Sequence, residues 1–376
     1  MPVYVSKAVT VGGFDHVNAV TIGGGFPVVI QTMWKDRLSF SDLEGSAGKA
    51  LVDRIEGLAA MGCGVLRFAV PDMQSAEVLG ALAGMVSMPL SADIHFDYRI
   101  ALRCLDFPIA KIRINPGNIG NLEKVKAVLS KAASTGVPIR IGVNGGSLPP
   151  DLRQQINEGR LGQAEALVFA AERELAVFRE FGFDKVLVSM KASSVADTIK
   201  ANRILAERSD VPLHIGVTEA GPLIAGVVRN TVALHALLVK GIGDTIRVSL
   251  SDSMENEVIA GREILRVLAD DKDAVTPVRL GGSRGVAIIS CPRCGRNGFD
   301  THRFIERWRE FLYMLKKDIT VAIMGCAVNG PEEARHADLG ITGVGNKALI
   351  FRSGKVIRTI DVAEADSAFQ EELEKL

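Results

Sequence analysis

The sequence lacks an excess of either charge and an uninterrupted apolar run typical of a membrane span. Its 376 residues include 44 basic and 44 acidic ones, so it has no basic tail or stripe for nucleic acid. The most apolar segment is interrupted by Arg229, His235 and Lys240, and no basic flank leads into an apolar N-terminus. We expect a soluble, cytoplasmic protein that binds neither nucleic acid nor membrane.

Cysteine is scarce, with five residues in the whole chain. An odd number at uneven spacing argues against a disulfide framework and indicates thiols kept reduced, as in the cytosol. Cys63 and Cys104 have no partner at the spacing of a metal motif. Both are expected to be buried small apolar residues.

Two domains are expected, because the chain exceeds the length at which one hydrophobic core usually stops growing. Eight β-branched runs alternate with amphipathic stretches in the first part: VVIQTM, VLRFAV, LSADIHF, AKIRIN, PIRIGVN, KVLVSMKA, PLHIGVTEAG and DTIRVSL. Eight consecutive βα units predict an α/β fold, a TIM (β/α)8 barrel over residues 1–273. The alternative is an open doubly wound sheet, but here GGGF precedes the first strand, whereas that fold has its glycine loop after it.

Polar residues near the ends of these runs predict a binding site. Pairs such as Asp93 and His95, two apart on one strand, point to one side of it. The carboxyl ends of barrel strands form the active-site mouth, and guanidinium groups bind phosphate oxygens in bidentate fashion. A single arginine there could instead form a salt bridge across the rim. The set is harder to explain in that way and predicts a diphosphate site: Arg67, Asp93, Arg113, Asn115, Arg140, Asn144, Lys191, Glu219, Arg247 and Ser249.

The pattern changes in residues 274–376, which are expected to form a small α+β domain with a metal motif. Cys291 and Cys294 lie in CPRCGR directly after an apolar run, and Cys326 follows another in MGCAVNGPEEA. Two parallel strands ending side by side would bring the three thiolates together.

Three cysteines with one remaining position fit a 4Fe-4S cluster whose fourth iron is open to substrate. A structural zinc site usually has four Cys or His ligands, often from a second paired motif, which this sequence lacks. His336 could complete a three-Cys, one-His zinc site, so zinc remains the alternative.

Several long segments resemble those of the bacterial (E)-4-hydroxy-3-methylbut-2-enyl diphosphate synthases of the methylerythritol phosphate pathway. They are ADIHFDYRIAL, KIRINPGNIG, LHIGVTEAG, GIGDTIRVSL, SCPRCGR and MGCAVNGPEEA, spread along nearly the whole chain. The resemblance implies a TIM barrel followed by a cluster domain similar to a sulfite-reductase repeat. It also implies a head-to-tail homodimer, in which the cluster domain of one subunit closes the barrel mouth of the other.

The resemblance further implies a reaction. Reduced flavodoxin or ferredoxin supplies two electrons, one at a time, to the cluster, and methylerythritol cyclodiphosphate is opened to hydroxymethylbutenyl diphosphate with loss of a hydroxyl as water. Glu219, Asp93 and Asn144 would face the carbon skeleton, with Glu219 handling the proton. Glu333, seven residues after the last cysteine, would be the weak fourth ligand of the cluster. The residues implied to bind the diphosphate are Arg67, Arg113, Arg140, Lys191, Arg247 and Ser249.

The sequence departs from the family pattern in three places. Glu332 replaces a glycine beside Glu333 and offers an alternative ligand. QTMWKDR stands where the family has a Ser- and Thr-rich loop, so Trp34 and Lys35 could narrow or recharge the mouth, and the 222–238 segment also differs. Two further functions are considered: an electron-transfer or sensing protein that lost catalysis, and a phosphate-sugar or pterin-binding barrel with structural zinc.

Overall fold

The computed structural model describes residues 4–115, 119, 121–271, 274, 278, 280–281, 284–327 and 330–376. It divides into two compact units, Met1–Gly281 and Gly282–Leu376. Residue 273, where the sequence places the end of the barrel, lies outside the described residues, and that boundary stays a prediction. No helix within the described ranges is long and apolar enough to cross a membrane.

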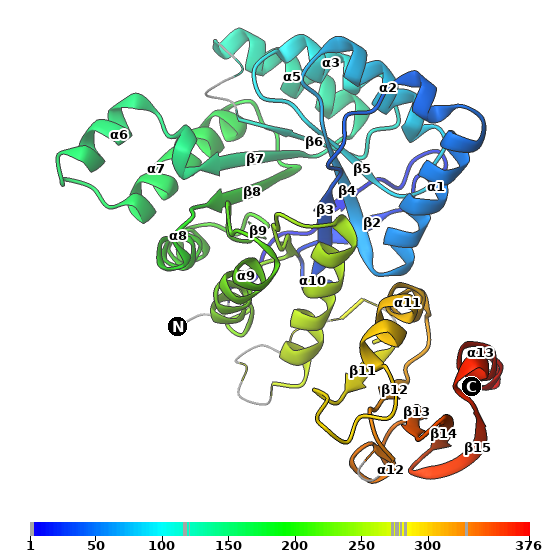
Figure 1. Cartoon of the computed structure of the whole chain (residues 1–376). Coiled ribbons are helices and arrows are strands. Elements are labelled where there is room, and N and C mark those ends of the chain that lie inside the picture. Colours follow the sequence, from blue (N-terminus) through cyan, green and yellow to red (C-terminus); the bar gives the residue numbers. More distant parts are fainter. Residues whose placement is uncertain are drawn as a thin grey trace. The chain divides into compact units, whose positions relative to one another are not determined.

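The first unit is the expected TIM barrel (Figure 1). Its parallel strands follow the order β8-β7-β6-β5-β4-β3-β10-β9, and a bridge between Val188 and Leu213 brings the sheet's two edge strands together. All eight predicted runs contain a strand. The strands are β3 (Val29–Met33), β4 (Cys63–Ala69), β5 (Leu90–Asp93), β6 (Lys111–Ile114), β7 (Ile139–Asn144), β8 (Val186–Lys191), β9 (His214–Ile215) and β10 (Thr245–Ile246).

Helices cover the outside of this sheet, and α5 (Leu122–Thr135) illustrates why they form. The side chain of Asn121 accepts a hydrogen bond from the backbone N–H of Lys124 and caps the first turn. The buried apolar residues recur at helical spacing, and Gly136 ends the helix with a φ of 73°. The others are α1 (Gly45–Ala60), α2 (Met73–Ala83), α3 (Tyr98–Cys104), α6 (Pro150–Asn157), α7 (Gln163–Glu180), α8 (Val195–Arg208), α9 (Leu223–Leu238) and α10 (Met254–Ala269).

An antiparallel hairpin of β1 (Val9–Val11) and β2 (Val20–Ile22) closes the end of the barrel at which the strands begin. Its apolar side chains pack with Val29 and Leu187, which lie near the amino ends of their strands. The segment before the hairpin is held by Ser6, whose hydroxyl donates to Asp244 at 2.6 Å. The sequence analysis did not predict this hairpin, and its presence leaves the carboxyl end as the open end of the barrel.

The second unit is a mixed five-stranded sheet with helices, as expected for α+β. In the order β11-β12-β13-β14-β15, the first three strands are parallel and the last two antiparallel to their neighbours. The strands are β11 (Ala287–Ser290), β12 (Thr320–Ile323), β13 (Leu339–Val344), β14 (Lys347–Arg352) and β15 (Lys355–Asp361); the helices are α11 (Thr301–Met314), α12 (Gly330–Glu333) and α13 (Ala365–Glu374).

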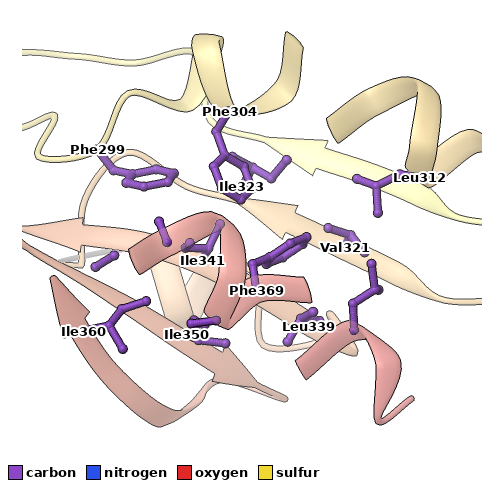
Figure 2. Close-up of a cluster of buried hydrophobic side chains, with 14 of the residues drawn as sticks. Phe299, Phe304, Leu312, Val321, Ile323, Leu339, Ile341, Ile350, Ile360 and Phe369 are labelled. Carbon is purple, nitrogen blue, oxygen red and sulfur yellow. The ribbon is translucent and has the colours of Figure 1, made fainter. Parts of the chain in front are cut away.

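An aromatic core joins the two longer helices of this unit to its sheet. Phe304 from α11 and Phe369 from α13 meet edge to face with ring centroids 5.2 Å apart. Figure 2 shows them in one cluster with the strand residues Val321, Ile341 and Ile350. This unit therefore has a hydrophobic core of its own.

Candidate functional site

The interior of the barrel is polar near its carboxyl end, although branched apolar side chains dominate barrel interiors in general. Strand register places Asp93, Arg113 and Arg140 side by side on β5, β6 and β7. All three are buried. The predicted convergence of charged side chains is therefore present in the described structure.

Asp93 is held between two arginines. Its carboxylate accepts from Arg113 at 3.0 Å and lies 3.4 Å from Arg67 Nη2, while His95 Nε2 is 3.5 Å away. Burial alone raises the pKa of Asp93, but the charge of Arg67, the His95 contact and the charge of Arg113 more than offset burial and hold it well below its usual value. Asp93 is therefore ionised at neutral pH and orients cations instead of donating a proton.

Arg113 lies directly across the next strand. Its Nη2 donates to the carbonyl of Gly142 at 3.3 Å. A Cβ atom at position 142 would lie 2.2 Å from Arg113 Nε, so a side chain there would displace the guanidinium. The observed position of the Arg113 side chain therefore depends on the glycine at position 142 of β7.

Arg140 has no such partner. Its side chain is 1% exposed, and its Nε and Nη1 have no hydrogen-bond acceptor in the described structure. Burial lowers the pKa of Arg140 well below its usual value, and the charges of Arg67 and Arg113 lower it further. A buried guanidinium with free N–H groups beside other cations is matched to an anionic ligand.

Lys191 contacts a buried histidine. Its Nζ lies 3.1 Å from His214 Nε2, and His214 Nδ1 lies 3.4 Å from the hydroxyl of Thr245. Burial and the charge of Lys191 hold the pKa of His214 well below its usual value. A neutral imidazole can accept a hydrogen bond from the lysine ammonium at Nε2, so His214 orients Lys191 without adding charge.

Arg247 is oriented by Glu257, a residue that the sequence analysis missed. Arg247 donates from Nε and Nη2 to the two carboxylate oxygens of Glu257, both at 3.1 Å. Thr32 Oγ1 at 2.7 Å and the backbone N–H of Leu250 at 3.0 Å donate to the same carboxylate. In the sequence, an acidic residue in the first turn of α10 is indistinguishable from one that only complements the helix dipole.

Lys35 uses the same carboxylate. Its Nζ lies 3.1 Å from Glu257 Oε1 and donates to the carbonyls of Leu250 and Asp252. Its neighbour Trp34 is buried and stacks on Phe68 with ring centroids 5.6 Å apart. The departure at QTMWKDR therefore supplies a lysine that forms an ion pair with α10. The same lysine also forms hydrogen bonds to the segment after β10.

Replacing Glu257 with glutamine is expected to destabilise the protein by about 2–4 kcal/mol, because Arg247 and Lys35 would lose their buried counter-charge. It should also raise the Michaelis constant for an anionic substrate about tenfold with a smaller change in kcat, since Arg247 would no longer be oriented. Urea denaturation and steady-state kinetics measure the two effects.

The matched control for Glu257→Gln is Glu255→Gln on the same helix. Glu255 pairs with Arg54, which is nearly half exposed, so its loss should cost less than about 1 kcal/mol. Equal, small effects of the two substitutions would show that Glu257 does not position Arg247.

Three further predicted residues lie at the end of the strands. Asn144 ends β7 and is paired in register with Lys191, and Ser249 follows β10; both are half-buried. Glu219 is exposed, and its φ of 52° is in the left-handed region that non-glycine residues rarely adopt. Such strain is common at functional sites.

Lys111 is a second residue that the sequence analysis missed. It is completely buried and donates to Gln31 Oε1 at 2.7 Å. It stands two residues before Arg113 on the same strand, so the alternation of β-strand side chains could have identified it. Among the described residues of the barrel, Asp93 and Glu257 form ion pairs with some of a larger set of buried or nearly buried cations. The six cations are Arg67, Lys111, Arg113, Arg140, Lys191 and Arg247.

In the second unit, Cys291 and Cys326 follow two adjacent parallel strands. Ser290 at the end of β11 is in register with Ile323 at the end of β12, as the sequence predicts. The backbone N–H of Gly325 donates to Cys291 Sγ at 3.0 Å, and a Cβ at Gly325 would lie 3.2 Å from that sulfur. Cys294 is exposed, and Arg293 in the turn between the two cysteines has a φ of 67°.

No three His, Cys, Asp or Glu side chains in the described ranges are close enough to hold one metal ion. The ligands of a 4Fe-4S cluster bind different iron atoms and do not converge on one point. Reduced cysteines and an N–H directed at a sulfur suit such a cluster. By contrast, Cys63 and Cys104 are buried as expected, and burial raises the pKa of each to about 12.

Glu333 lies in α12, which begins soon after Cys326. The backbone N–H of Gly330 donates to the carbonyl of Cys326 at 3.1 Å and holds this short helix beside the cysteine. Glu332 is 3.6 Å from Arg335, and both side chains are strongly exposed. His336, the alternative zinc ligand, is also exposed.

Comparison with known proteins gives two family matches. The model of the GcpE TIM-barrel domain matches residues 15–262, and that of the GcpE protein C-terminal domain matches residues 287–375. Proteins named 4-hydroxy-3-methylbut-2-en-1-yl diphosphate synthase (flavodoxin) are similar over nearly their whole length. Those of Treponema pallidum and Treponema denticola are 50% and 48% identical, covering 99% and 98% of this chain and 92% and 98% of their own. That of Thermodesulfovibrio yellowstonii is 42% identical over 96% of this chain and 97% of its own.

Proposed function

The chain belongs to the GcpE family, and on that basis we propose that it converts methylerythritol cyclodiphosphate to (E)-4-hydroxy-3-methylbut-2-enyl diphosphate in isoprenoid biosynthesis. The reaction opens the cyclic diphosphate, removes a hydroxyl as water and consumes two electrons. The protein is an oxidoreductase, and the named relatives use flavodoxin.

Arg140 carries the proposal on the structural side. A completely buried guanidinium whose Nε and Nη1 have no acceptor among the described residues, close to the charges of Arg67, Arg113 and Lys191, favours a ligand with several negative charges. A cyclic diphosphate meets this requirement. Ser249 and Arg247 would complete the phosphate contacts from the adjacent strand.

The remaining barrel residues have distinct proposed roles. Asp93 holds Arg67 and Arg113 in place, and Asn144 orients the carbon skeleton beside Lys191. Glu219 is the proposed proton donor to the departing oxygen, because it is exposed at the mouth and has no arginine partner among the described residues. Its strained backbone lies in the segment that follows β9.

The second unit is proposed to hold a 4Fe-4S cluster through Cys291, Cys294 and Cys326, with Glu333 as an exchangeable fourth ligand. When bound, the cluster supplies the electrons and a Lewis-acidic iron for the leaving oxygen. Glu333 is proposed in preference to Glu332 because the family pattern places the ligand seven residues after Cys326. Further proposals are a flavodoxin or ferredoxin as donor, a head-to-tail homodimer and a cytoplasmic location.

The test is turnover of methylerythritol cyclodiphosphate by anaerobically reconstituted protein with dithionite, with the product identified by mass spectrometry. The expected product is hydroxymethylbutenyl diphosphate. A protein that carries the cluster and binds the cyclodiphosphate without opening it would contradict the proposal. That outcome would favour another phosphorylated ligand and a role in electron transfer or sensing.

A further inference from the structure

The loop that carries two of the cysteines is an exposed, cationic projection. Residues 292–296 are all exposed, and Arg293 and Arg296 flank the exposed Cys294 within it. The left-handed backbone at Arg293 turns the chain so that both neighbours face solvent. An arginine at each side of the exposed cysteine therefore marks the accessible face of this site.

Arg303 extends this cationic surface onto the first turn of α11, where its side chain is 80% exposed. We define the arginine patch as Arg293, Arg296 and Arg303. Asp300 forms ion pairs with two members of the patch, at 3.4 Å from Arg293 and 3.7 Å from Arg303. Arg296 has no ion pair within the part of the chain that the structure describes.

Other arginines of this unit have carboxylates of their own. Arg307 pairs with Asp366, and Arg358 with Glu371. The arginine patch differs from these pairs, because its three guanidinium groups have one carboxylate, that of Asp300, among the described residues. Such a patch attracts an acidic partner over a distance and orients it.

The patch is also firmly anchored. Beyond it, the backbone N–H of Gly298 donates to the carbonyl of Gly325 at 2.7 Å, and Phe299 is buried in the core of the unit. Asn297 donates its backbone N–H to the carbonyl of Cys294 at 3.0 Å. A rigid charged surface suits a transient partner, because little ordering is needed when it binds.

We infer that the arginine patch is the docking surface for an acidic, flavin-bearing electron donor. This inference rests on the proposed function, which requires a donor to deliver two electrons. In each encounter the reduced flavin loses one electron and the cluster gains it, so two encounters serve one turnover. Electron-transfer complexes are small and weak, and three arginines around an exposed cysteine match that class.

The experiment compares two reductants on the holoenzyme. Arg296→Glu with Arg303→Glu should lower kcat/KM for a reduced bacterial flavodoxin about 10–100-fold, while turnover driven by dithionite stays unchanged. Raising the salt concentration should lower kcat/KM for flavodoxin more in the wild type than in the variant, because salt screens the charges of the patch. A glutamate at position 303 lies in the first turn of α11, where negative charge favours the helix.

The matched control is Lys316→Glu, an exposed cation just beyond the opposite end of α11, which should affect neither reductant. Titration of isotope-labelled oxidised flavodoxin with each protein measures docking without turnover. An equal loss with both reductants, or unchanged flavodoxin binding by the double variant, would overturn the inference. If the wild type makes no product with dithionite, the proposed function fails, and the titration still tests docking.

Discussion

Replacing Arg140 with methionine is expected to raise the melting temperature of the substrate-free protein and to remove most of its affinity for substrate. The guanidinium is completely buried, its Nε and Nη1 have no acceptor among the described residues, and it is repelled by Arg67 and Arg113. Substituting an apolar side chain of similar volume for a buried charge often stabilises by about 1–4 kcal/mol. The melting temperature should therefore rise by several degrees.

The same substitution should lower kcat/KM about 100-fold or more, because the lost bonds are charge-assisted and buried. Calorimetry without substrate and kinetics with it measure the two effects separately. Arg179→Met, at an exposed position on α7, should change neither quantity. A fall in melting temperature with Arg140→Met would mean that the guanidinium is already satisfied in the free protein and is not reserved for an anion.

Replacing Cys326 with alanine is expected to remove the iron–sulfur cluster and all turnover. Three thiolates and one carboxylate are the proposed ligands, and the remaining Cys291 and Cys294 cannot hold a cluster of four irons without Cys326. Iron and acid-labile sulfide in the anaerobically reconstituted protein should fall to background. Cys104→Ala is the matched control: it removes a buried thiol on α3 and should cost stability while leaving the iron content unchanged.

Glu333→Ala distinguishes the weak ligand from the strong ones. Loss of an exchangeable carboxylate should leave part of the iron in place and abolish turnover, whereas Glu332→Ala should retain both. Full activity of the Glu333 variant would contradict the proposed ligand, and a loss confined to the Glu332 variant would move the role to that residue.

The barrel and its cations could be predicted from the sequence because both depend on local patterns. Each β-branched run forms a strand, and side chains two apart on a strand face the same side. The placement of Cys291 and Cys326 was predictable for the same reason, since both follow apolar runs that form adjacent strands.

The parts that could not be predicted depend on contacts between distant segments. Glu257 follows Arg247 closely in the sequence, but its carboxylate is also held by Thr32 and Lys35 because α10 packs beside β3, which no local pattern encodes. The hairpin of β1 and β2 consists of two strands of three residues each, too short for an alternation to be recognised. Trp34 could be expected to stand at the mouth, but it stacks on Phe68 and is buried.

The close approach of Arg113 to Gly142 constrains how this protein can evolve. A side chain at position 142 would collide with the guanidinium where it now lies, so a substitution there requires the arginine side chain to move or to be shortened. We therefore expect that homologues with arginine at the position of Arg113 have glycine at the position of Gly142.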